Sequence, residues 1–239
     1  MDVPITVETA LEDRPVAGAT CLEAGAGVGK TTAGLLAAGA GRVYAVTDDR
    51  ADARTVRERI GADARRRTAV LEADLREAPL ASDSVDVITA HGLFNVLAPA
   101  DVPAVVAELT RVARPGAHLV VDDYAPPPEE ALVRDLFAVE NAAAQLAAGR
   151  PALSFYPARF LRETLVGAGW SFDRQRTLLD PVPWTANHVA AHAERARSLA
   201  ADAPERLRDP LLAEIDRIES AVEEERAGQM YSLAVRLPE

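Results

Sequence analysis

Short apolar segments alternate with helical segments along most of the chain. Each apolar segment is bounded by Gly, Asp or Pro and carries few polar residues, as is typical of strands that are buried on both faces of a parallel sheet. The pattern predicts an α/β fold with a doubly wound, mostly parallel sheet of seven strands and helices on both faces. The predicted strands are Ala19–Glu23, Arg42–Thr47, Thr68–Glu72, Val85–Thr89, His118–Asp122, Ser171–Arg176 and Met230–Leu237.

Helical periodicity fills the segments between these strands. Gly and Pro residues end several of the segments, because Gly adopts a left-handed C-cap and Pro cannot continue a helix. The predicted helices are Lys30–Ala38, Ala51–Ile60, Asp101–Val112, a segment from about residue 129 to 148, and Phe160–Val166.

The segment 184–228, between the last two strands, is polar and helical. Its apolar positions, spaced by four, three and four, fall on one helix face: Leu211, Ile215, Ile218 and Val222. Gly228 is a candidate C-cap for this helix. A single apolar stripe usually packs on the protein's own core, so we expect the helix against the sheet edge. A lid over a substrate, or the surface of a homodimer, is the alternative.

Composition narrows the class of protein. The 239 residues, 49% of them hydrophobic, predict one domain over residues 1–239. The formal net charge of −11 disfavours binding of nucleic acid over a broad surface. No apolar run is long enough to span a membrane, and residues 1–4 do not resemble a signal peptide, so we expect a cytoplasmic protein. The single cysteine, Cys21, predicts a buried thiol and excludes an internal disulfide.

A glycine-rich loop follows the first predicted strand and opens the first helix. Residues 23–32 read Glu-Ala-Gly-Ala-Gly-Val-Gly-Lys-Thr-Thr. Glycines let such a loop turn sharply and approach a ligand, and the helix N-terminus adds free N–H groups. Two motifs overlap here. One is acidic-x-Gly-x-Gly-x-Gly, which begins at Glu23; the other is a relaxed phosphate-binding loop that ends in Gly29-Lys30-Thr31.

The phosphate-binding alternative has support elsewhere in the chain. Lys30 is the only lysine, and Leu119–Asp122 resembles the acidic strand that accompanies such loops. Glu23 argues against it, because a carboxylate at the strand end repels several phosphate charges. The same carboxylate would attract the cationic methionine end of S-adenosylmethionine. The loop alone does not decide between the two.

Acidic residues follow the next two strands at spacings that suit a nucleoside. Asp48 lies 19 residues after Gly29, where a carboxylate can bind both ribose hydroxyls. Asp74 can accept a hydrogen bond from an adenine amino group, and Leu75 can pack on the ring. Asp48 or Asp49 can alternatively serve only as a helix N-cap.

Taken together, residues 17–125 resemble the small class I S-adenosylmethionine-dependent methyltransferases of the ubiquinone and menaquinone biosynthesis type. The likeness includes the glycine loop, Asp74-Leu75, the run 81–92 and Glu108–Gly116 leading into the fifth strand. It implies methyl transfer from S-adenosylmethionine to a small-molecule acceptor, an antiparallel last strand, and a cofactor-binding core at 17–125. Residues 126–228 would then form a substrate cap. A phosphate-binding NTPase, and a cofactor-binding module without catalysis, are the alternatives.

The resemblance also implies which residues bind the cofactor. Those expected at the methionine and ribose are Glu23, Ala24, Gly25, Gly27 and Asp48; Asp74 and Leu75 would lie at the adenine, and Ala90 and His91 beneath the sulfonium. One position departs from the pattern, because Thr47 stands where the family usually has the ribose-binding acid and Asp48 comes one residue later. Either Asp48 takes that role, or Asp49 or a water substitutes.

No catalytic residue is fixed by the pattern. Methyl transfer depends largely on positioning, and a base is needed only if the acceptor loses a proton. His91, Tyr124 and Tyr156 are candidates, with cofactor-pocket shaping as the alternative for His91. His188 and His192 share a helix face, but no third ligand is evident, so we expect no metal.

Overall fold

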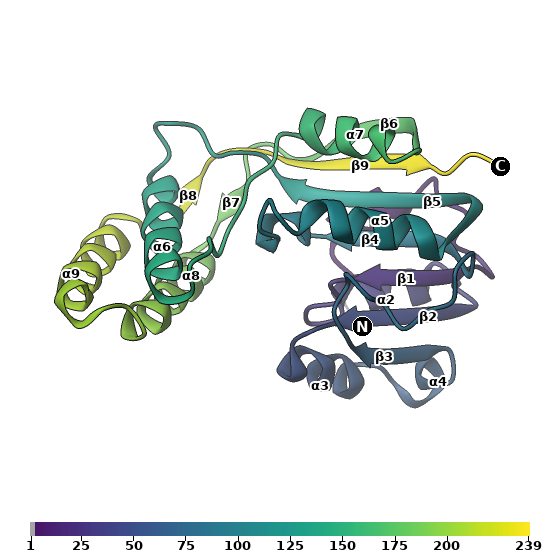
Figure 1. The fold of residues 1–239 in the computed structure, drawn as a ribbon, viewed down its shortest axis with the longest axis horizontal. Coiled ribbons are helices and arrows are strands. Elements are labelled where there is room, and N and C mark those ends of the chain that lie inside the picture. The colour runs from purple at the N-terminus through teal and green to yellow at the C-terminus, as the bar shows by residue number, and fades with distance from the viewer. Residues whose placement is uncertain (1–2) are drawn as a thin grey trace.

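A seven-stranded sheet has the order β3-β2-β1-β4-β5-β9-β6 (Figure 1). The computed structural model describes residues 3–239, the side chains of residues 62 and 63 excepted. The strands of this sheet are β1 Thr20–Ala24, β2 Arg42–Thr47, β3 Thr68–Glu72, β4 Val85–His91, β5 Ala113–Tyr124, β6 Ser171–Leu179 and β9 Met230–Arg236. Only β9 is antiparallel to its neighbours, and it pairs with β5 and with the edge strand β6. The seven predicted strands and the antiparallel last strand are therefore confirmed.

The central strands are buried because helices cover both faces of the sheet. Leu22 of β1, Ile88 of β4 and Leu119 of β5 have no exposed surface and join one apolar cluster. Helix α5 adds the row of residues that its apolar spacing predicts, namely Val102, Val105, Val106, Leu109 and Val112. Continuous apolar strands beneath amphipathic helices are what the sequence pattern of a parallel sheet requires.

The five helices predicted with bounds, which correspond to α2, α3, α5, α6 and α7, begin and end within about three residues of those bounds. The helices of the described residues are α1 Ile5–Leu11, α2 Lys30–Ala37, α3 Arg50–Arg59, α4 Ala62–Arg65, the 3₁₀ helix η1 Phe94–Val96, α5 Val102–Val112, α6 Leu132–Ala148, α7 Ala158–Gly167, α8 Ala186–Ala201 and α9 Glu205–Ala221. Helix α1, which the sequence pattern did not predict, packs closely on α2. A Cβ atom on Gly34 would lie 2.5 Å from Val7 Cγ1.

Helices α6, α8 and α9 pack together beyond the carboxyl ends of the parallel strands (Figure 1). With the small sheet formed by β7 (Pro183–Trp184) and β8 (Glu225–Arg226) they make a group that we call the cap. Its buried residues, among them Leu136, Ala193 and Ile215, form a second apolar cluster separate from that of the sheet.

The structure corrects the prediction for segment 184–228. It holds two helices rather than one, interrupted around Pro204, and they pack on α6 instead of on the sheet edge. Gly228 is not the C-cap of α9, because that helix ends at Ala221 and Val222 is its C-cap; Gly228 lies between β8 and β9 with φ of 73°. The predicted packing partner was wrong, because α8 and α9 pack their apolar residues against those of α6 and not against the sheet edge.

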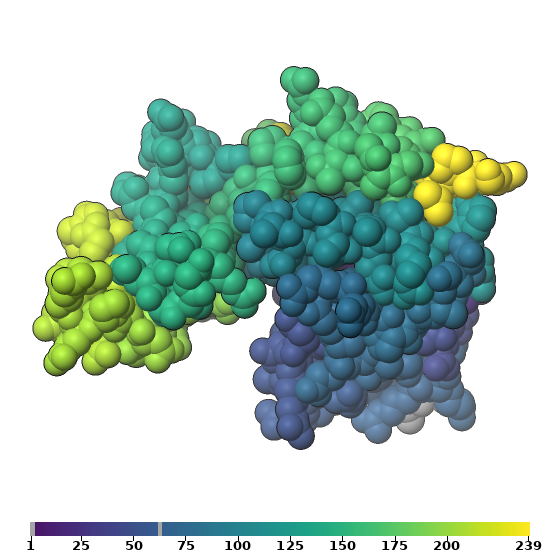
Figure 2. All heavy atoms as spheres, viewed as in Figure 1, coloured from purple at the N-terminus to yellow at the C-terminus, as the bar shows by residue number. Residues whose placement is uncertain are grey.

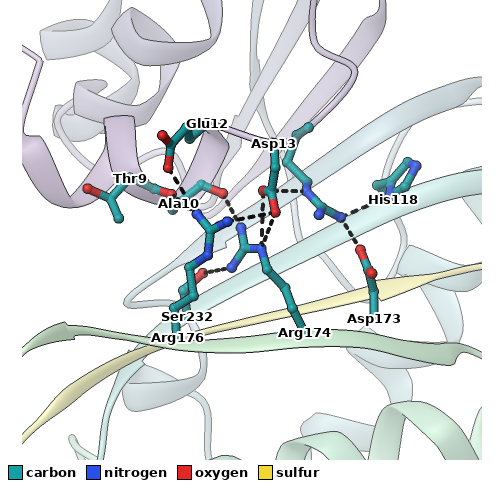
Figure 3. A network of polar contacts seen from close by, with 10 residues as sticks. Thr9, Ala10, Glu12, Asp13, His118, Asp173, Arg174, Arg176 and Ser232 are labelled. Carbon is teal, nitrogen blue, oxygen red and sulfur yellow. Dashed lines mark hydrogen bonds and ion pairs between the residues drawn. The ribbon is translucent and has the colours of Figure 1, made fainter.

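A network of charged side chains ties the N-terminal segment to strand β6 (Figure 3). Asp13 accepts hydrogen bonds from Arg14, Arg174 and Arg176. Arg14 also donates to Asp173 and lies 3.1 Å from the Nδ1 atom of His118. These contacts join the segment that follows α1 to the edge of the sheet, so we assign the network a structural role.

Within residues 3–239, no helix combines the length and the apolar character that crossing a bilayer requires.

Candidate functional site

A cavity of about 470 Å³ lies where the carboxyl ends of the strands meet the cap. Figure 2 shows the surface hollowed between the cap and the part of the core that carries α3. The wall combines the ends of β1, β2, β3 and β4 with two cap residues, Arg150 and Arg195. Open α/β sheets bind their ligands at this end of the strands, and the volume is within the ~300–1,000 Å³ of small-molecule sites.

The glycine loop forms one wall of the cavity. Gly25 and Gly27 have φ of +75° and +46°, in the left-handed region that glycine adopts without strain. The loop is held against β2, because the N–H groups of Gly25 and Ala26 donate to the Val46 carbonyl at 3.0 and 2.8 Å. A Cβ atom on Gly25 would lie 3.0 Å from Leu93 Cδ1, whereas one on Gly27 would meet no protein atom within 4 Å. Gly27 therefore leaves open space for a ligand.

Three predicted cofactor residues lie behind the wall rather than on it. Ala24 and Ala90 have no exposed surface and pack in the apolar core. Glu23 is 2% exposed and accepts a hydrogen bond from the Thr32 hydroxyl of α2. Burial raises the pKa of Glu23 to about 8, against the lowering effect of its hydrogen bonds to Thr32 and Thr31. Glu23 was expected to attract the methionine end of the cofactor, directly or through a water, and the structure places its carboxylate beneath the loop.

The acids after β2 have separate roles. Asp49 is the N-cap of α3, and its Oδ1 accepts hydrogen bonds from the Ala51 and Asp52 N–H groups at 2.7 and 2.9 Å. The Thr47 hydroxyl oxygen accepts a hydrogen bond from the Asp49 N–H at 3.2 Å. Asp48 is exposed on the cavity wall and has no hydrogen bond or ion pair within the described part of the chain. Of the two acids, Asp48 is the one free to bind a ligand.

Asp74 and Leu75 line the cavity as expected, and Arg76 lines it beside them. Arg76 donates to both carboxylate oxygens of Asp74 from Nε, at 3.0 Å each, and reaches Asp101 with Nη1 at 2.9 Å. Hydrogen bonds from Arg76 lower the pKa of Asp74. Arg76 thus holds Asp74 ionised and fixed at the end of β3.

His91 ends β4 on the cavity wall, one residue before Gly92. Its Nδ1 atom lies 3.2 Å from Oδ2 of Asp122, the facing residue of β5. Asp122 is 2% exposed, and its other oxygen has no hydrogen-bond partner within residues 3–239. A buried carboxylate behind an imidazole fixes the orientation of the ring and leaves the second nitrogen for the cavity side.

The two candidate tyrosines are not on the cavity wall. Tyr124 packs against Trp184 with ring centroids 5.2 Å apart. Tyr156 is 9% exposed and donates its hydroxyl hydrogen to the Leu97 carbonyl at 3.1 Å. Burial raises the pKa of both hydroxyls. These contacts give both residues packing roles.

Sequence reasoning missed the two arginines that the cap contributes. Arg150 follows α6, and Arg195 lies on α8, where a charged residue on a polar face gives no local signal of a site. The Nε atom of Arg195 lies 3.1 Å from Oε1 of Glu140, a carboxylate on α6 with no exposed surface. His192 occupies the other oxygen of Glu140 at 2.7 Å. His192 is therefore paired with a carboxylate, and no cluster of three or more His, Cys, Asp or Glu within the described residues is suited to a metal ion.

The elements of the phosphate-binding alternative are not assembled. Lys30 is exposed and is absent from the cavity wall, while Asp122 is buried against His91. Strand β4 separates β1, which leads into the loop, from β5, which carries Asp122. A phosphate-binding loop needs the lysine and the acid around one group of phosphates.

Comparison with known proteins gives a consistent result. The family model described as methyltransferase domain matches residues 22–121. A demethylmenaquinone methyltransferase from Clavibacter sepedonicus is 35% identical over 115 residues, which are 48% of this chain and 44% of that protein. Another from Mycolicibacterium paratuberculosis is 32% identical over 152 residues, 56% of this chain and 60% of that protein. The chain thus spans about half the length of these relatives.

Among solved structures, a putative methyltransferase from Bacillus halodurans C-125 has a TM-score of 0.65 and 13% sequence identity, over 98% of this chain and 99% of that one. A likeness at this identity concerns the fold alone, and it extends through the cap. The sequence match makes residues 22–121 of this chain similar to methyltransferase domains, and the fold of the chain is similar to that of solved methyltransferase structures.

Proposed function

We propose that the chain is an S-adenosylmethionine-dependent methyltransferase that acts on a small-molecule acceptor in the cavity between the core and the cap. The observation that carries the proposal is the position of Gly25, Gly27, Asp48, Asp74 and His91 around one cavity. These residues come from the ends of four different strands, and they match the places where a nucleoside with an amino-acid tail would be held.

The residues present fit this cofactor. Gly27 leaves room against the loop, where any side chain would enter the ligand's space. Asp48 is free to bind the two ribose hydroxyls, and Asp74 with Leu75 offers a hydrogen-bond acceptor and an apolar surface for the adenine. The excess of carboxylates on the core side suits a ligand with a net positive charge. When bound, S-adenosylmethionine supplies a methyl group on a positively charged sulfur.

His91 is the residue that we assign beside the reacting centre. Its ring is oriented by Asp122 and faces the cavity between the core and the cap. If the acceptor attacks through a hydroxyl oxygen, that oxygen forms the new bond to the methyl carbon, the sulfur–carbon bond breaks, and the hydroxyl proton passes to His91. For an acceptor without such a proton, His91 shapes the pocket. The remaining rate enhancement is positional, because the core and the cap confine the acceptor.

Calorimetric titration with S-adenosylhomocysteine and, separately, with Mg-ATP tests the proposal. The proposal predicts that S-adenosylhomocysteine binds and that Mg-ATP does not. Binding of Mg-ATP alone would contradict it and would return Lys30 and Asp122 to the phosphate-binding role. A third outcome concerns catalysis. Binding of S-adenosylhomocysteine without methyl transfer to any acceptor in a broad screen would favour the cofactor-binding module without catalysis.

A further inference from the structure

The cap presents two positive charges to a cavity whose other wall is acidic. Arg150 and Arg195 are the cap's contribution to the wall among the described residues, whereas the core side carries Asp48, Asp49, Asp52, Asp74 and Asp101. Most of those acids already have partners: Arg76 pairs with Asp74 and Asp101, and Asp49 caps α3. The two cap arginines therefore form a distinct feature of the site.

The guanidinium of Arg195 forms an ion pair with Glu140. Glu140 is completely buried, and its Oε1 atom lies 3.1 Å from Nε of Arg195, without the geometry of a hydrogen bond. The other oxygen of Glu140 accepts a hydrogen bond from Nδ1 of His192 at 2.7 Å, and the His192 ring packs on Phe137 with centroids 4.8 Å apart. This ion pair restricts the rotation of the Arg195 side chain before any ligand binds, so less freedom is lost on binding. The two terminal NH₂ groups of Arg195 are left for an anion.

Arg150 adds a second cation without any internal partner. It has no hydrogen bond or ion pair within residues 3–239, and neither cap arginine pairs with a core acid there. The guanidinium group binds carboxylates and phosphates through two parallel hydrogen bonds. A neutral acceptor would leave Arg150 without a paired anion and would leave Arg195 with Glu140 as its only paired anion within residues 3–239.

We propose that the acceptor carries a carboxylate or phosphate group, which Arg195, supported by Glu140, binds together with Arg150 on the cap side of the cavity. The inference rests on the proposed function, since it takes the cavity to be the site of methyl transfer. It makes the acceptor an anionic small molecule and makes the cap the part that selects it. The two arginines could instead bind the carboxylate of the cofactor's amino-acid tail. The experiment therefore has to distinguish an anionic acceptor from the cofactor.

Binding of benzoate and of its neutral analogue benzamide to protein saturated with S-adenosylhomocysteine tests the proposal. Inorganic phosphate serves as a second anion. The expected result is that benzoate or phosphate binds saturably, that benzamide binds about tenfold more weakly or not at all, and that Arg195→Gln and Arg150→Gln each weaken anion binding about tenfold. Arg197→Gln is the matched control. It removes the same charge from the same helix, but Arg197 pairs with Asp216 and Glu219 away from the cavity.

Two results would overturn the proposal. The first is a failure of the anion titrations: benzoate and phosphate do not bind, benzamide binds as tightly as benzoate, or Arg197→Gln weakens anion binding as much as Arg195→Gln and Arg150→Gln do. The other is a loss of affinity for S-adenosylhomocysteine, but not for 5′-methylthioadenosine, in Arg195→Gln, since that would assign the arginine to the cofactor's carboxylate. The wild-type affinity for S-adenosylhomocysteine is measured first. Its absence would contradict the proposed function, whereas the anion titrations without nucleoside would still report on the two arginines.

Discussion

Replacement of the buried Glu23 by Gln should stabilise the protein at neutral and alkaline pH. The carboxylate is 2% exposed, lies beneath the glycine loop, and accepts a hydrogen bond from the Thr32 hydroxyl, which the amide oxygen of Gln can also accept. Burial raises the pKa of Glu23 from its ordinary value of 4.5 to about 8. The folded protein therefore keeps a proton over a pH range in which the unfolded chain has lost it.

The sign and size of the effect follow from this difference. Since the folded-state pKa is the higher one, the contribution of Glu23 to stability is fully present below pH 4.5 and is lost as the pH rises towards 8. Each pH unit in this window costs about 1.4 kcal/mol. At pH 7 the wild type should be less stable than Glu23→Gln by about 3 kcal/mol, and the gap should close near pH 4.5.

Urea unfolding of both proteins at several pH values between 5 and 8 measures the gap. Glu72→Gln, at the exposed end of β3, corrects for the loss of one negative charge. Parallel stability curves for the wild type and Glu23→Gln over this range would contradict a raised pKa of Glu23 in the folded protein. That result would mean that Glu23 is ionised in the folded state and that a partner or a water stabilises its charge.

The remaining predictions concern the loop, the ribose site and the N-terminal network. Gly27→Val should weaken S-adenosylhomocysteine binding at least about tenfold in a protein with an unchanged circular dichroism spectrum, because the side chain enters the ligand's space; Lys30→Ala should leave that binding nearly unchanged, and the reverse order of effects would contradict the site. Asp48→Asn should weaken the same binding about tenfold by calorimetry, since hydrogen bonds to a charged group are lost. Asp49→Ala should lower the free energy of unfolding by about 1 kcal/mol in urea, through loss of the α3 N-cap; no change would show that the cap contributes nothing. Burial alone would raise the pKa of Asp13, but hydrogen bonds from the arginines in Figure 3 lower it well below 3.8, so its stabilisation is present above pH 3.8 and is lost as the pH falls further; Asp13→Asn should therefore be the less stable protein at pH 6 and approach the wild type near pH 2, as measured by thermal unfolding.

The strands and the glycine loop were predictable because local patterns determine them. Each central strand is apolar on both faces, and a sharp turn between a strand and a helix requires residues such as Gly25 and Gly27. Asp48, Asp74 and His91 follow strand ends, and parallel strands bring their carboxyl ends to one edge of the sheet. Arg76 follows Asp74 by only two residues, so their side chains can meet. Only the structure shows that Arg76 donates hydrogen bonds to Asp74.

The placement of the cap was not predictable in the same way. Helix α8 packs on α6 largely through alanines, among them Ala193 and Ala196, which leave a weak apolar stripe in the sequence. Arg195 reaches the cavity only because of that packing. The depth of Glu23 escaped prediction for a related reason, since its partner Thr32 lies on the next helix and draws the carboxylate away from the cavity.

A crystal structure of the protein with S-adenosylhomocysteine would show whether the cavity is the cofactor site. We expect the ribose hydroxyls at Asp48, the adenine between Asp74 and Leu75, the amino-acid tail over Gly25 and Gly27, and the sulfur facing His91. A nucleoside bound elsewhere, or a cavity wall that does not contact it at these residues, would contradict the account.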